Sequence, residues 1–278
     1  MDPAKLLRPT EISAQHQYFP KLGEAWEHRH LSWVLARRNL KLRYAQTILG
    51  SVWIVIQPVL LAGMLTAIFG LLIALPTDGV PYALFAFAGT TLWSAFQRAL
   101  VDTGISMAGN SAIILKVYFP RILVPLACVL TAVIDFLPVY ALLILVTLID
   151  GQLSGWPILL SPLFALLALL LAFGGGLWTT ALDAIFRDVR LVVPTILQLA
   201  FYATPIMYSE SVVPQHWRLL YHLNPFLGVI EGFRWSIIAG AHPPEIADLS
   251  WSVVFAGFCL VTGLMLFARL ETFAVDRV

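Results

Sequence analysis

Charge is what this sequence lacks most. Only 12% of its 278 residues are Asp, Glu, Lys or Arg, about half of the ~25% that is usual in soluble globular domains. Hydrophobic residues make up 59% of the chain. A chain with so few charges has little polar surface to offer to water. It is therefore predicted to be solvated mainly by lipid, with little room for a separate soluble domain.

Cysteine is also scarce. Cys128 and Cys259 both fall inside apolar runs, whereas a disulfide framework needs paired cysteines in aqueous, oxidising loops. Both are expected to be small buried residues without a disulfide.

Residue patterns for catalysis, metal binding and nucleotide binding are missing as well. The six histidines form no metal-binding spacing on one helix face, and no Gly-rich phosphate loop is followed by Lys and Ser or Thr. Gly174, Gly175 and Gly176 lie within an apolar run, where close helix packing is the better interpretation. We therefore expect no catalytic residue, metal or cofactor in this chain. If the protein uses ATP, another chain must bind it.

The first long apolar run, residues 51–75, follows a cluster of cations at Arg37, Arg38, Lys41 and Arg43. A run of this length can cross the ~30 Å hydrocarbon core of a bilayer with some tilt. Lys and Arg beside a first span keep that end in the cytoplasm. This boundary predicts a membrane protein and its orientation.

Five further apolar runs follow the first one. They cover residues 82–101, 121–149, 157–182, 191–208 and 251–268. Six crossings place both termini in the cytoplasm, and all 17 Lys and Arg except Arg218 and Arg234 then lie on or near the cytoplasmic side. The predicted fold class is an all-α integral membrane protein with six transmembrane helices.

The expected organisation has three parts. Residues 1–50 form a cytoplasmic N-terminal region with an amphipathic interface helix, 51–270 the transmembrane domain, and 271–278 a cytoplasmic tail. Within the transmembrane domain, residues 205–248 are broken by Pro and Gly into pieces too short to span, so re-entrant external helices are predicted there.

Residues 110–120 are apolar yet too short to cross the membrane, and they lie on the predicted cytoplasmic side. They are expected to form a coupling helix that contacts an ATPase subunit through apolar anchors along one face. A helix buried among lipid headgroups is the alternative. The candidate contact residues are Asn110, Ile113, Ile114, Lys116, Tyr118 and Phe119.

Ionisable residues in apolar surroundings are usually paired or functional. Asp135 lies in the middle of the third run, where a structural hydrogen bond or a place in a polar conduit is favoured over proton coupling. Arg98 and Asp102, four residues apart, are predicted to pair on one helix face. Arg187 and Asp188 are adjacent in the turn between the fourth and fifth runs, so each is expected to find a partner elsewhere.

Aromatic side chains are frequent near the predicted span ends, where they often act as interface anchors. Their flat faces also suit the apolar faces of sugar rings, so they are candidates for lining a glycan pathway. The candidates are Trp53, Trp93, Phe96, Trp178, Tyr202, Tyr208 and Trp235.

Several separated motifs resemble one family. The pattern from Arg38 to Pro58 is Arg38-x-x-Lys41-x-Arg43-Tyr44-x-x-Thr47-x-Leu49-Gly50-x-x-Trp53-x-x-x-x-Pro58. It resembles the entry to the first span of polysaccharide ABC exporter permeases, which places Arg38, Lys41, Arg43 and Tyr44 at the membrane boundary. The segments 110–120, 186–188, 203–206 and 224–225 resemble that family's coupling region, internal loop and external re-entrant region.

The resemblance implies a homodimer in a bacterial inner membrane, bound to two nucleotide-binding subunits that hold ATP and Mg²⁺. Such an assembly exports a lipid-linked polysaccharide, such as O-antigen, capsule or teichoic acid, with no nucleic-acid partner. Two rival functions stay open. A proton-coupled transporter normally shows inverted repeats and several buried ionisable groups, and a membrane-embedded glycan or acyl transferase needs a positioned acid–base group.

Overall fold

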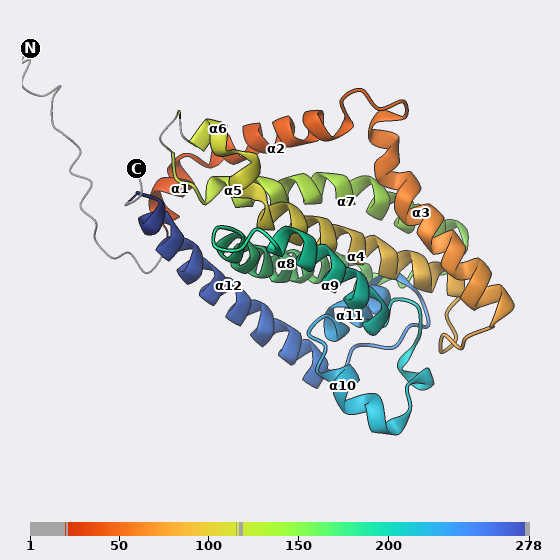
Figure 1. The fold of residues 1–278 in the computed structure, drawn as a ribbon. Helices are drawn as coiled ribbons and strands as arrows, with labels where there is room; N and C mark the ends of the chain where they lie inside the picture. The colour runs from red at the N-terminus through yellow and green to blue at the C-terminus, as the bar shows by residue number, and fades with distance from the viewer. Residues whose placement is uncertain (1–19, 21, 115, 117–118, 276–278) are drawn as a thin grey trace, which may run out of the picture.

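The computed structural model describes residues 20, 22–114, 116 and 119–275, and within them it is almost entirely helical, with no strand (Figure 1). This confirms the all-α class. The α-helices are α1 (Leu22–Glu27), α2 (Arg29–Tyr44), α3 (Trp53–Leu65), α4 (Tyr82–Gly104), α5 (Ser106–Gly109), α6 (Ser111–Ile114), α7 (Leu123–Ile149), α8 (Ser161–Asp183), α9 (Val189–Ala203), α10 (Arg218–His222), α11 (Leu227–Ile237) and α12 (Ile246–Val275). Shorter 3-10 and π turns extend several of them, at Gly50–Val52 (η2), Thr66–Leu72 (η3), Trp156–Leu160 (η4), Glu210–Val212 (η5) and Gln215–Trp217 (η6).

Four helical segments are both long and apolar enough to cross a membrane. They are Gly50–Leu72, Leu123–Ile149, Trp156–Asp183 and Ile246–Arg269. The two other predicted spans fall short for different reasons. Helix α4 has 23 residues but a more polar composition, and α9 has 15 residues, fewer than the ~20 that a bilayer requires.

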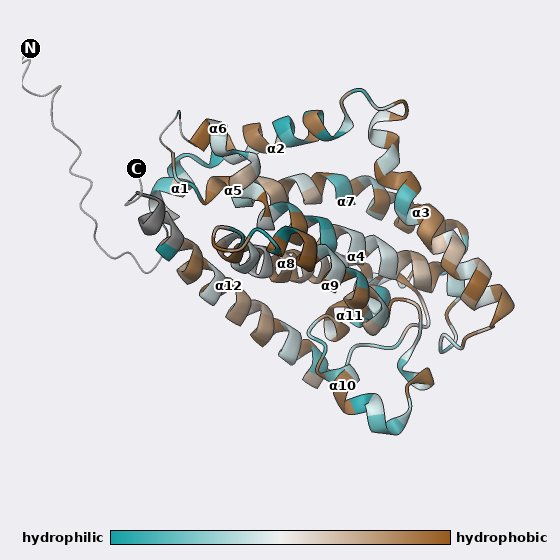
Figure 2. Ribbon diagram, viewed as in Figure 1, coloured by the Kyte–Doolittle hydropathy of each residue, from teal (hydrophilic) through white to brown (hydrophobic). Residues whose placement is uncertain are grey.

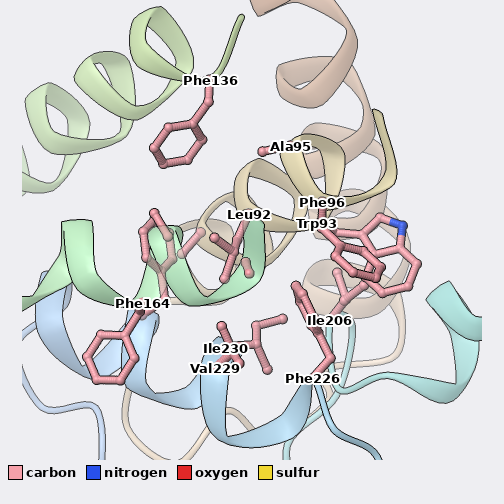
Figure 3. Close-up of a cluster of buried hydrophobic side chains, with 14 of the residues drawn as sticks. Leu92, Trp93, Ala95, Phe96, Phe136, Phe164, Ile206, Phe226, Val229 and Ile230 are labelled. Atoms are coloured by element: carbon pink, nitrogen blue, oxygen red, sulfur yellow. The ribbon is translucent and has the colours of Figure 1, made fainter. Parts of the chain in front are cut away.

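Helix α4 forms the centre of the bundle, where it packs against α3, α7 and α8 (Figure 1). Most of its residues are buried, among them Leu92 and Ala99. A helix that faces protein on nearly all sides does not need lipid-compatible side chains, so its Thr and Gln residues are tolerated. Figure 3 shows how Leu92 packs among side chains from α8 and α11.

Glycine brings α8 and α12 into backbone contact. A Cβ built on Gly174 would lie 2.6 Å from the carbonyl carbon of Cys259, and one on Gly263 would lie 2.7 Å from the carbonyl oxygen of Gly174. No side chain fits between backbones this close, and such small-residue crossings are typical of packed membrane helices. The interpretation of Gly174 to Gly176 as a packing site is confirmed.

The N-terminal helices α1 and α2 form the expected helix pair, and α2 lies along the first half of α7. Hydrophilic and hydrophobic turns alternate along α2 (Figure 2). The C-terminal half of α12 returns to this same end of the molecule, because Phe267 packs in one cluster with Ala25 of α1. Helix α10 lies at the opposite end of α12 (Figure 1).

Both segments predicted to hold short helices contain short pieces. Within the predicted coupling helix, 110–120, the described residues form the one-turn helix α6, and residues 115, 117 and 118 lie outside the described residues. The predicted segment 205–248 does consist of short pieces, namely η5, η6, α10 and α11.

We predict that Gly174→Val lowers the stability of the purified protein in detergent by about 1–3 kcal/mol, because the added methyl groups must push α12 away from α8. Gly257→Val on α12 is the matched control, since nothing lies within 4 Å of its Cβ position. Thermal unfolding of both variants checks this, and equal stability of the two would refute the close-packing argument.

Candidate functional site

The most polar site in the bundle forms around the last turn of α2. Arg43 Nη1 donates to Asp135 Oδ2 of α7 at 2.7 Å, and Arg43 Nη2 donates to Asp102 of α4. Arg98 Nη1 of α4 lies 3.6 Å from the same Asp135 oxygen. We call these four residues the Arg43 cluster. It joins three helices that are far apart in the sequence.

Charge balance is what makes this cluster tolerable in an apolar bundle. Asp135 is 2% exposed, while Arg43 and Asp102 keep some contact with solvent. Two guanidinium groups face two carboxylates, and removal of one member would leave a buried charge uncompensated. Burial alone would lower the pKa of Arg43, but the Asp102 and Asp135 carboxylates outweigh it and raise the pKa, so Arg43 stays charged.

The predicted pair of Arg98 with Asp102 is wrong. Arg98 pairs with Asp135, and Asp102 pairs with Arg43. Spacing along one helix revealed only the local neighbour, whereas α2 and α7 supply the stronger partners. The structure gives Asp135 the structural ion pair favoured for it, although its Oδ1 atom has no hydrogen-bond partner.

The expectation for Arg187 and Asp188 is also wrong. Within the part of the chain that the structure describes, neither side chain makes an ion pair. The charged pair in this turn is formed instead by Arg190 and Asp183, through two hydrogen bonds of 2.5 and 2.9 Å. This bidentate contact fastens the start of α9 to the end of α8.

A second polar contact links α2 to the predicted coupling segment. Arg38 Nη1 donates to Asn110 Oδ1 at 2.9 Å, and Asn110 Nδ2 donates to the Ser106 carbonyl at 2.9 Å. Lys41, from the same motif, is exposed, and Tyr44 is half-buried beside the main core. Helix α2 is thus attached both to α5–α6 and to the bundle interior.

The apolar residues of the coupling segment face inward more than predicted. Phe119 is buried with Ala25 and Leu123, and Ile113 and Ile114 pack half-buried against the same cluster. The expectation that Phe119 faces a partner is therefore wrong, because the chain's own helices bury it. Lys116 is exposed, and Tyr118 lies outside the described residues.

Two of the predicted pathway aromatics, Trp93 and Phe96, are core residues. Trp93 is 3% exposed, and its ring centroid lies 5.3 Å from that of Phe226. Phe96 is 7% exposed, and its ring centroid lies 4.8 Å from that of Phe226 (Figure 3). Both border a cavity of about 430 Å³ between α4, α8, α9 and α12. Within this chain both side chains therefore serve core packing, and their role in a glycan pathway stays a prediction.

The other predicted aromatics divide between packing and exposure. Trp178 donates to Thr262 of α12 at 2.9 Å, Trp235 contacts Trp156, and the Tyr208 hydroxyl donates to the Ala203 carbonyl at 3.1 Å. Trp53 of α3 and Tyr202 of α9 are 39% and 56% exposed. These two rings are the ones available for contact beyond this chain.

Sequence reasoning missed the role of Arg234. Arg234 is 5% exposed and donates to the carbonyls of Phe85, Pro205 and Ile206 at 2.6–3.2 Å. Its guanidinium carbon also lies 3.4 Å from the centre of the Phe85 ring. It fastens α11 to α4 and to the turn after α9. A lone cation in an otherwise apolar helix was the available signal.

These features define a helical integral membrane protein whose amphipathic α2 is joined to the bundle by buried charges. Comparison with known proteins identifies its family. Residues 30–238 match the ABC-2 type transporter family. The chain belongs to this family, as its motifs suggested.

Curated relatives cover most of the chain. An O-antigen export system permease from Klebsiella pneumoniae is 30% identical over 86% of this chain and 91% of its own length. One from Myxococcus xanthus is 25% identical over 76% and 81%. A polysialic acid transport protein from Escherichia coli is 22% identical over 84% and 91%.

We predict that Arg43→Gln destabilises the protein by about 1–3 kcal/mol. Removing one partner of a fully buried ion pair costs ~3–5 kcal/mol, and the loss is smaller here because Arg43 keeps some solvent contact. The double variant Arg43→Gln/Asp135→Asn should recover part of this loss, since one cation, Arg98, and one carboxylate, Asp102, remain and the charges of the cluster still balance. Arg37→Gln, which removes an exposed cation over Trp33, is the control. Unfolding in detergent measures all three, and strictly additive effects of the two substitutions would argue against the pairing.

Proposed function

We propose that this chain is the transmembrane permease subunit of an ATP-driven exporter that moves a lipid-linked polysaccharide, such as O-antigen or capsule, from the cytoplasm across the bacterial inner membrane. The observation that carries the proposal is similarity along most of the chain to permeases of O-antigen export systems. The resemblance of the Arg38 to Pro58 motif to the same class is a further support.

In the proposed topology the chain crosses the membrane six times, with α4 and α9 as the two crossings beyond the four apolar segments. Both termini then face the cytoplasm. Packing of Phe267 near the C-terminus against Ala25 near the N-terminus supports this, because it puts both ends on one side. The distribution of Lys and Arg supports the cytoplasmic assignment of that side.

Energy enters this subunit mechanically in the proposed mechanism. Two nucleotide-binding subunits hold ATP and Mg²⁺ and contact the surface around α5 and α6, where Ser111 and Lys116 are exposed. Movement there would reach α2 through the Arg38–Asn110 hydrogen bond. From α2 it would reach α4 and α7 through the Arg43 cluster.

The export pathway is proposed to lie between two copies of this chain. Among the cavities of the described residues, the one of about 430 Å³ is too small to pass a polymer. Helix α3 is the least buried of the four candidate spans, and α9 exposes Leu191, Leu199 and Tyr202. A homodimer that joins these helices would place the exposed rings of Trp53 and Tyr202 along its interface.

The rival functions gain no support from the geometry. Asp135 faces two arginines, an arrangement that favours a structural ion pair over a place in a proton relay.

We predict that Ser111→Glu/Lys116→Glu lowers co-purification of the nucleotide-binding subunit several-fold, because it reverses the charge of an exposed surface without entering the core. Lys41→Glu on α2 is the control, because it makes the same change as Lys116→Glu at an exposed lysine outside α5 and α6. Pull-down from membranes, with permease abundance as the loading standard, measures the effect. Normal co-purification and export by the double variant would refute the assigned contact.

We predict that Trp53→Ala/Tyr202→Ala reduces export more than the two single changes suggest, because each sugar–ring contact is weak and several act together. Trp156→Ala removes a more exposed ring that contacts Trp235 instead, and it should export normally. Polysaccharide at the cell surface is the readout at matched permease abundance. Normal export by the double variant would show that these rings only anchor the helices at the membrane interface.

A further inference from the structure

The end of the molecule that carries α10 holds a second group of ionisable side chains, formed by three separate segments. His222 is the last residue of α10, and Asp248 lies in the first turn of α12. Glu245 directly precedes α12, and Glu210 begins η5. We call these four residues the His222 cluster. None of them was singled out by a sequence motif.

The two nitrogens of His222 face different carboxylates. Nδ1 lies 3.0 Å from both carboxylate oxygens of Asp248, which is 4% exposed. Nε2 lies 3.7 Å from Glu210 Oε1 on the other edge of the ring. One ligand atom from each of His222, Glu245 and Asp248 lies within 4.8 Å of the other two.

The short contacts at Nδ1 require either a proton or a metal ion between the ring and the Asp248 carboxylate. A neutral imidazole carries one N–H, and metal-binding histidines commonly donate the N–H of the second nitrogen to a carboxylate. If Nε2–H points to Glu210, the lone pair of Nδ1 faces two carboxylate oxygens at 3.0 Å. Three electron-rich atoms at that distance repel one another unless a proton or a metal ion lies between them.

We propose that His222, Glu245 and Asp248 bind one divalent transition-metal ion of the Zn²⁺ type, with Glu210 holding the ring in the required tautomer. One imidazole nitrogen with carboxylate oxygens suits Zn²⁺ and similar borderline ions, whereas Ca²⁺ and Mg²⁺ prefer oxygen ligands alone. The proposal is independent of the cargo that the protein exports.

The surroundings of the cluster also favour a dication. The neighbouring carboxyl of Glu231 is largely buried, and burial together with the charge of Asp248 raises its pKa to about 7. Arg234, the cation that acts on Glu231, already donates to three backbone carbonyls. Part of the rise in the pKa of Glu231 comes from the charge of Asp248, and a cation bound to Asp248 would offset that part.

A bound ion would fasten the segment between α9 and α12. In the protein alone, α10 is held to α12 by the His222–Asp248 contact and by the Trp251 indole, which donates to the Leu223 carbonyl at 3.0 Å. A metal ion would replace a polar contact with coordinate bonds to both segments. It would thus restrict movement of α10 relative to the first turn of α12.

The test uses the full-length permease, purified in detergent and treated with a chelator before ZnCl₂ is added. Zinc content after desalting should be close to one ion per chain, and the thermal unfolding midpoint should rise, because the ion binds the folded state. His222→Gln should abolish this zinc binding. Glu210→Gln should weaken it roughly 10- to 100-fold, because Glu210 orients the His222 ligand without binding the ion itself. His216→Gln, an exposed histidine six residues earlier, should bind zinc normally.

Glu245→Gln removes a proposed ligand without disturbing the fold, because Glu245 is exposed. It should weaken zinc binding while the unfolding midpoint of the metal-free protein stays unchanged. Zinc content no higher than background in the unsubstituted protein, or equal in His222→Gln, would overturn the proposal. Stabilisation by mild acid with no zinc uptake would also overturn it, and would assign the space around Nδ1 to a proton.

Discussion

The guanidinium of Arg43, shared between Asp102 and Asp135, is the contact on which the arrangement of this protein depends most. It attaches an amphipathic helix, which would otherwise lie loosely on the membrane surface, to the two helices at the bundle centre. A planar group with several fixed donors suits two acceptors at once, as a lysine ammonium would not. Because Asp135 is buried, the contact is costly to break, so α2, α4 and α7 are expected to move together.

Arg234 performs a similar task at the other end of α4. It uses neutral acceptors, the carbonyls of Phe85, Pro205 and Ile206, and needs no carboxylate partner. Between these two arginines the bundle relies on close apolar packing, with Gly174 and Gly263 bringing α8 and α12 into backbone contact. Polar contacts thus close both ends of a core that has little chemistry of its own.

The two ends differ in the sign of their unbalanced charge. The end with α1 and α2 carries exposed cations such as Arg37 and Lys41, which suits contact with anionic lipid headgroups and follows the distribution expected for the cytoplasmic side. The end with α10 gathers Glu210, Glu245 and Asp248 around one histidine. A compensating cation at that end would complete a bundle held at both ends by charge.

The sequence by itself determined the solvent, the all-α class and the family. Low charge and long apolar runs leave only lipid as the main solvent, and the pattern from Arg38 to Pro58 indicated the permease class. Only the tertiary structure decided which residues meet. Arg43 pairs with Asp102 and Asp135, and Arg234 donates to backbone carbonyls. Phe119 and Trp93 are buried in the interior. Spacing along a chain reports neighbours within one helix. These contacts join helices up to about 150 residues apart. No local sequence pattern states which of these helices pack against each other.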